Sequence, residues 1–127
     1  MATNPVYEKI LATMPDGLER SLMNVLQHHV GNDKRISRAM LVRMIFNRPW
    51  SANCTEDRQI REAISSLQKT VPVLSDSGKG GYYLASSADE IKLYAEEIVS
   101  RARELEEKAR WLRSLAERMF TEQPSLF

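Results

Sequence analysis

Apolar residues recur at intervals of three and four over most of this chain, and such spacing is typical of amphipathic helices. Four segments before residue 70 show it: residues 4–13, 17–30, 37–46 and 55–69. Residues able to cap a helix stand at three of these starts, namely Asn4 followed by Pro5, Ser37 and Thr55. The pattern therefore predicts a mainly α-helical protein.

The same periodicity predicts which face of each helix is buried. The helix over residues 37–46 is expected to bury Met40, Leu41, Met44 and Ile45. The helix over residues 55–69 is expected to bury Ile60, Ala63, Ile64 and Leu67.

A different pattern follows between residues 71 and 85. Residues 71–76 and 82–85 are rich in strand-forming side chains, and the glycine-rich segment 77–81 lies between them. Two such runs around a short turn predict a β-hairpin. Residues 34–36 are a further short candidate for an edge strand.

A last helix is predicted over residues 87–121, with a capping box at Ser87 and Glu90. It carries two rows of apolar residues at seven-residue spacing, which is a heptad pattern with small residues in one row and large ones in the other. The rows, here called the apolar seam, are Ala95, Ala102, Ala109 and Ala116, and Ile98, Leu105, Leu112 and Met119. Either the first helix of the same chain covers this seam, or a second copy does so in a homodimer.

Positive charge is concentrated in the middle of the chain, although the whole chain carries only +1. Residues 34–69 have eight basic and three acidic side chains, whereas the segments on either side are each net negative. A polyanion is the partner that such a block favours, although scattered basic residues on a solvated surface produce the same count.

The segment from Asp57 to Leu67, followed by Val73-Leu74-Ser75 and Gly81-Tyr82-Tyr83-Leu84-Ala85, resembles winged-helix proteins of bacteriophages and prophages. The resemblance covers about residues 17–86. It implies a winged helix-turn-helix domain there, flanked by an N-terminal helix in 1–16, the long helix in 87–121 and a tail in 122–127. It also implies binding to double-stranded DNA.

In this interpretation the helix beginning at Thr55 is the recognition helix. Arginine pairs with guanine and glutamine with adenine, while serine and lysine suit phosphates. Glu62 in the same face either accepts from cytosine or keeps the face from lying flat on DNA. The candidate DNA-binding residues are Ser37, Arg38, Arg58, Gln59, Arg61, Ser65, Lys69 and Lys79.

The last five residues resemble the binding motif for the bacterial sliding clamp. Gln123, Ser125, Leu126 and Phe127 match it, and Pro124 replaces the commoner leucine. An apolar pocket on the clamp would bury the leucine and phenylalanine. The alternative is that these two side chains complete the core of their own chain.

Other chemistry has little support in the sequence. The single cysteine, Cys54, excludes a disulfide framework, and neighbouring His28 and His29 point about 100° apart on a helix. We expect no enzyme activity, cofactor, metal or small-molecule ligand, no membrane span, and a cytoplasmic location. The expected function is an accessory role in DNA replication or recombination. The alternatives are a dimeric winged-helix transcription regulator and a phage protein that inhibits a host protein without contacting DNA.

Overall fold

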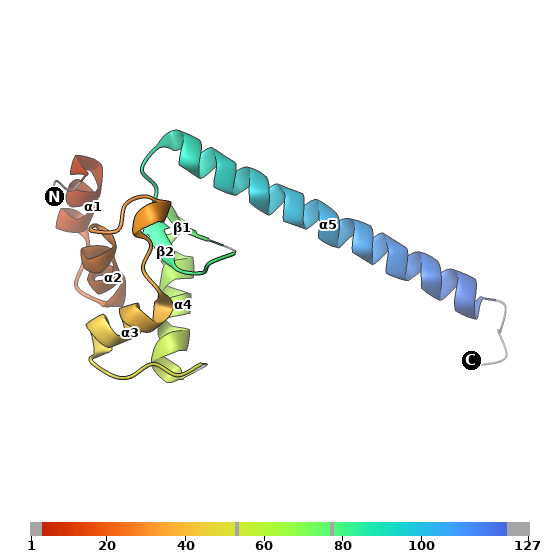
Figure 1. The fold of residues 1–127 in the computed structure, drawn as a ribbon, viewed down its shortest axis with the longest axis horizontal. Helices are drawn as coiled ribbons and strands as arrows, with labels where there is room; N and C mark the ends of the chain where they lie inside the picture. Colours follow the sequence, from red (N-terminus) through yellow and green to blue (C-terminus); the bar gives the residue numbers. More distant parts are fainter. Residues whose placement is uncertain (1–3, 53, 77, 122–127) are drawn as a thin grey trace. The chain divides into compact units, whose positions relative to one another are not determined.

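The computed structural model describes residues 4–52, 54–76 and 78–121 and divides into two compact units, residues 1–91 and 92–127. In chain order the elements are α1 (Pro5–Thr13), α2 (Leu18–Leu26), a 3₁₀ helix η1 (Asn32–Lys34), α3 (Arg38–Phe46), α4 (Thr55–Leu67), β1 (Val73–Ser75), β2 (Tyr82–Leu84) and α5 (Ala88–Phe120) (Figure 1). The prediction of a mainly helical protein with a small antiparallel hairpin and a long final helix is confirmed.

Side-chain caps start the helices largely where the sequence predicts. Asn4 accepts a hydrogen bond from the Val6 amide at 2.9 Å, and Ser37 accepts one from the Met40 amide at 3.1 Å. The prediction of Thr55 as a cap is wrong by one residue. Cys54 has the extended backbone of a cap, and its Sγ accepts from the Asp57 amide at 3.4 Å, whereas Thr55 is already helical.

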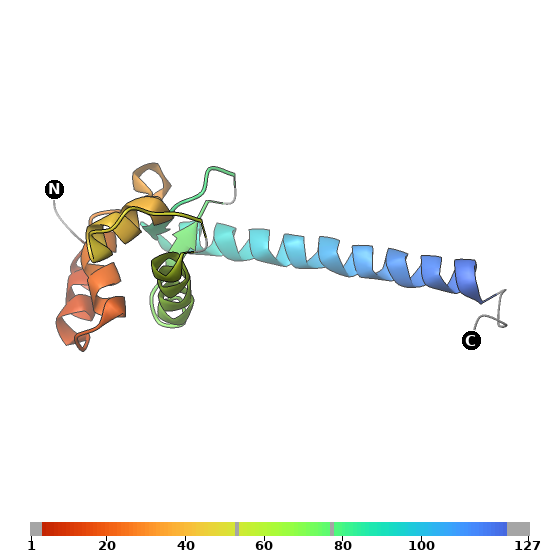
Figure 2. The ribbon, with the colours of Figure 1, turned by 90° about the horizontal axis from the view of Figure 1, so that it is seen from below.

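The core of the first unit lies where α4 packs against α2 and α3, with the hairpin closing one side (Figure 2). The predicted α4 stripe is confirmed, since Ile60, Ala63, Ile64 and Leu67 are all buried. The helix α1 belongs to the same unit. Its Tyr7 is buried, and the Tyr7 hydroxyl donates to the Ala85 carbonyl at 2.5 Å.

The prediction for α3 is partly wrong. Leu41 and Val42 are fully buried and Ile45 packs beside them, but Met40 and Met44 are 43% and 56% exposed. The segment is apolar at nearly every position, so several faces satisfy a helical period. Packing against α2 and α4 selects the face that carries the branched residues.

The hairpin pairs Val73 with Leu84, and Ser75 with Tyr82. Residues 34–36 form no strand; Ile36 alone bridges Tyr82, through two backbone hydrogen bonds of 2.8 Å. The helix α2 also ends earlier than predicted, at Leu26, because Val30 bridges Leu84 and its backbone is therefore committed to the sheet.

The helix α5 begins at Ala88 and continues through residues 92–120 of the second unit. At the start of α5, within the first unit, the predicted cap Ser87 is present, since its Oγ accepts from the Glu90 amide at 3.2 Å. The predicted capping box is half formed, because Glu90 accepts from the Ser86 amide at 2.8 Å and not from the Ser87 amide. Every seam residue is on this helix, and none is buried.

Candidate nucleic-acid interface

The outer face of α4 carries most of the predicted DNA-binding residues. Arg58, Gln59, Glu62 and Ser65 are all exposed, and Lys69 is exposed two residues beyond the end of the helix. Positions three and four apart lie on the same side of a helix, so these side chains form one surface opposite the buried stripe. We call it the α4 outer face.

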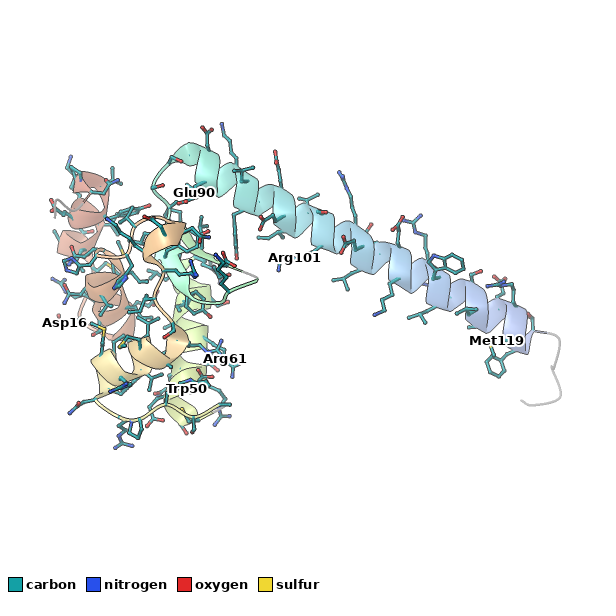
Figure 3. The ribbon with its side chains drawn as sticks, viewed as in Figure 1. Asp16, Trp50, Arg61, Glu90, Arg101 and Met119 are labelled. Atoms are coloured by element: carbon teal, nitrogen blue, oxygen red, sulfur yellow. The ribbon has the colours of Figure 1, made fainter. Side chains whose placement is uncertain are left out.

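A buried carboxylate lies at the start of α4. Asp57 is fully buried, and its Oδ1 is 2.5 Å from Arg38 Nε and 2.8 Å from Trp50 Nε1. Its Oδ2 is 3.4 Å from Arg61 Nε, in an ion pair without a well-directed hydrogen bond among the described residues. Figure 3 labels Trp50 and Arg61, which come from the loop after α3 and from α4. Asp57 therefore connects α3, this loop and α4.

Burial alone would raise the pKa of Asp57. The hydrogen bonds from Trp50 and Arg38 and the positive charges of Arg38 and Arg61 outweigh burial, so the pKa lies below its ordinary value. The carboxylate is consequently ionised at neutral pH, as its partners require.

This cluster changes the roles of two predicted DNA-binding residues. The guanidinium groups of Arg38 and Arg61 already face Asp57, and Ser37 Oγ is used as the cap of α3. In contrast, no acidic side chain within residues 4–52, 54–76 and 78–121 lies within ion-pair distance of Arg58 or Lys69. On the α4 outer face, Arg58 and Lys69 are thus the cations whose charge is still available for a polyanion.

The tip of the hairpin is held by a second aspartate. Asp76 accepts hydrogen bonds from the amides of Lys79 and Gly78, at 2.8 and 2.9 Å, and from Asn32 Nδ2 at 3.0 Å. These three bonds lower the pKa of Asp76 to about 2. The Lys79 amide is therefore held by Asp76, while the residue itself is exposed to solvent.

A surface groove of about 660 Å³ is formed by α3 and the loop that follows it. It is lined by Ala39, Arg43, Met44, Asn47, Arg48, Pro49 and Trp50. Arg48 is paired with Glu56 at 3.1 Å. Arg43, on α3, is therefore a further exposed basic residue that lines this groove.

Sequence reasoning missed Asp57, Asp76, Asn32 and Trp50 as organisers of this surface. An acidic residue in the first turn of a helix is explained by the helix dipole alone, so nothing in the pattern signals that Asp57 is buried. For Asp76, a signal was available, because aspartate before a glycine-rich turn commonly accepts from the following amides.

The remaining predictions concern the clamp-binding residues, metal binding and membrane spans. The clamp-binding candidates Gln123, Ser125, Leu126 and Phe127 lie outside the described residues. No three histidine, cysteine, aspartate or glutamate side chains in the described part of the chain are grouped to hold a metal ion. Among the helices of that part, none combines the length and apolar character needed to cross a membrane.

Comparisons with protein-family models, with curated proteins and with solved structures returned no match.

Proposed function

We propose that residues 17–86 form a winged-helix domain, related in kind to those of bacteriophage proteins, that binds duplex DNA. The order of α2, α3, α4 and a hairpin supports this, as does the bridge between Ile36 and Tyr82, which corresponds to a minimal third strand. In this arrangement α4 is the recognition helix and the turn around Lys79 is the wing.

The observation that carries the proposal is the α4 outer face. Two of its cations, Arg58 and Lys69, have no acidic partner among the described residues, while the neighbouring Arg61 and Arg38 are paired with Asp57. Arg58 and Gln59 would meet base edges, and Ser65, Lys69 and Lys79 would meet phosphates. The Asp57 cluster would set the orientation of α4 while these side chains make contact.

We further propose that residues 123–127 bind the bacterial sliding clamp. Leu126 and Phe127 would fill an apolar pocket, and Gln123 and Ser125 would supply polar contacts. Two weak attachments on one chain raise the local concentration at each site, so neither needs high affinity. The protein would then be a non-enzymatic accessory factor that attaches the clamp to DNA during replication or recombination.

Salt-dependent binding tests the DNA half. Arg58→Ala and Lys69→Ala should each weaken binding to a short duplex and lower the dependence of log K on log salt by about 1, because each removes one cation from the interface. Lys9→Ala, on the exposed side of α1, is the matched control and should leave both quantities unchanged. Wild-type protein that shows no salt-sensitive duplex binding at low ionic strength would refute this half.

Glu62→Gln gives a test of opposite sign. It removes the one negative charge from the α4 outer face, so nonspecific duplex binding should tighten. Unchanged or weaker binding would place DNA elsewhere on the molecule.

Capture on immobilised clamp tests the other half. The double variant Leu126→Ala, Phe127→Ala should lose binding to the clamp and keep its duplex affinity, whereas Glu122→Ala should keep both. Clamp binding that survives the double substitution contradicts the proposed motif. Clamp binding without any duplex affinity would instead favour an inhibitor of a host protein.

A further inference from the structure

The helix α5 exposes an apolar surface far larger than a solvated helix needs. Exposed fractions reach 47% for Ile98, 66% for Leu105, 58% for Leu112 and 59% for Met119. Figure 3 shows side chains projecting from α5 along its length, with Arg101 and Met119 labelled. An apolar row of this size on a 33-residue helix is typical of an interaction surface.

The first helix of the same chain is already engaged elsewhere. Tyr7 is buried in the first unit, and Ile10, Leu11 and Met14 pack against the core of that unit. The apolar face of α1 is thus used in the core within residues 1–91.

We propose that the seam pairs with the seam of a second copy of this chain, in antiparallel orientation. The steric pattern favours this orientation. In a parallel pair, alanine faces alanine in one layer and a large side chain faces a large side chain in the next. The layers of large side chains would hold the two helices apart and so leave voids at the alanine layers. In an antiparallel pair, each large side chain faces an alanine, and all layers have similar thickness.

One register satisfies the pattern over the whole seam. It places Leu105 against Ala109 of the second copy, Leu112 against Ala102, Ile98 against Ala116 and Met119 against Ala95. Each of these contacts occurs twice, because the pair has two-fold symmetry. The resulting interface is a continuous set of small and large residues that interdigitate.

The flanking positions agree with the same register. Glu106 faces Arg113 of the second copy, an opposite-charge pair that symmetry repeats. Val99 faces Phe120 of the second copy, and Tyr94 faces Leu115 of the second copy. On a single chain Val99 is 48% exposed and Phe120 is 49% exposed. Arg101 and Lys108 are the one like-charged pair, and their long side chains reach solvent.

Shifting the register by one heptad in either direction loses this agreement. A shift in one direction places Glu106 opposite Glu106 of the second copy. A shift in the other direction places Arg113 opposite Arg113 of the second copy. Like charges directly opposed destabilise a pair, so the charge pattern selects the same alignment that the alanine rows favour. Pairing through the seam requires neither DNA binding nor clamp binding.

Sedimentation equilibrium of the full chain tests the pairing at micromolar concentration. A dimer is expected, and Leu105→Glu should raise its dissociation constant by about a hundredfold or more, since the change removes two buried leucines and buries charge. Ser100→Glu introduces the same charge on the opposite side of α5 and should leave the dimer intact. A monomeric wild type, or equal effects of the two substitutions, overturns the proposal.

Cysteine cross-linking tests the orientation in a Cys54→Ser background. A mixture of Leu105→Cys and Ala109→Cys chains should form a disulfide-linked heterodimer, while Leu105→Cys alone should not link to itself. Spin labels on Lys92→Cys should lie about 45 Å apart, from thirty residues at 1.5 Å each. Self-linking of Leu105→Cys, or labels within about one helix diameter, would show a parallel pair and overturn the antiparallel assignment.

Discussion

Replacing Asp57 with asparagine tests whether one buried carboxylate fixes the orientation of α4 and its outer face. Asparagine has nearly the same shape and keeps an oxygen that accepts from Trp50 Nε1. It removes the negative charge that Arg38 and Arg61 face at 2.5 and 3.4 Å. The variant therefore separates the charge of Asp57 from its volume.

The expected loss of stability follows from these contacts. A hydrogen bond between charged groups contributes about 1.5–3 kcal/mol, against about 0.5–1.5 for a neutral one. The side chains of Arg38 and Arg61 are 36% and 42% exposed, so both can turn to water and the cost is reduced. We expect Asp57→Asn to lower the free energy of unfolding by about 1–3 kcal/mol and Asp57→Ala by about 3–5.

The pH dependence has a definite sign. The pKa of Asp57 is lowered in the folded state, so its contribution is complete above the ordinary pKa of 3.8 and is lost as pH falls through the lower folded value. Protonated aspartate resembles asparagine. The difference between wild type and Asp57→Asn should therefore be constant from pH 7 to about 5 and shrink below pH 4.

Urea unfolding followed by circular dichroism measures this difference at each pH. Asp89→Asn, an exposed acidic residue in the first turn of α5, is the control and should change stability by no more than about 0.5 kcal/mol. Equal stability of wild type and Asp57→Asn at pH 7 would refute the role of the carboxylate. A difference that persists undiminished below pH 3 would refute the electrostatic explanation.

Substitutions at three further positions test single contacts of the first unit, each by urea unfolding. Tyr7→Phe removes the hydroxyl that donates to the Ala85 carbonyl and should cost about 1–2 kcal/mol; no loss would mean that water satisfies that carbonyl equally well. Gly81→Ala should cost about 1–3 kcal/mol, because φ is +92° and a Cβ would lie 3.1 Å from the Ile36 carbonyl oxygen; a neutral result would show that the turn relaxes. Cys54→Ser should be neutral or stabilising while Cys54→Ala costs about 1 kcal/mol, and equal values would exclude the cap.

Local pattern in the sequence was sufficient to predict the α-helices and the hairpin, but not the 3₁₀ helix at Asn32–Lys34. The stripe of Ile60, Ala63, Ile64 and Leu67, the caps Asn4 and Ser37, and the hairpin around residues 77–81 all depend on neighbours within a few positions. Such features hold wherever the segment lies, because helix periodicity and capping are properties of the local backbone. The exposed α4 outer face follows directly from the buried stripe.

Tertiary contact decided what local pattern left open. The buried face of α3 was ambiguous because nearly every side chain there is apolar, and packing on α2 and α4 selected Leu41 and Val42. The end of α2 was set by the distant strand β2, through the bridge between Val30 and Leu84. A helical period contains no information about such long-range partners.

In the candidate site, too, some features follow from local sequence and others from tertiary contact. The sequence determined by itself that basic residues gather in the middle of the chain and that α4 presents Arg58 and Lys69 on one side. Only the tertiary structure decided that Asp57 is buried and that Arg38 faces it, whereas Arg61 lies four positions from Asp57 on the same helix and is a local partner. Arg58 and Lys69 have no acidic partner among the described residues. The reason is physical: an ion pair depends on distances between residues that the fold brings together, and Arg38 is nineteen positions from Asp57 in the chain.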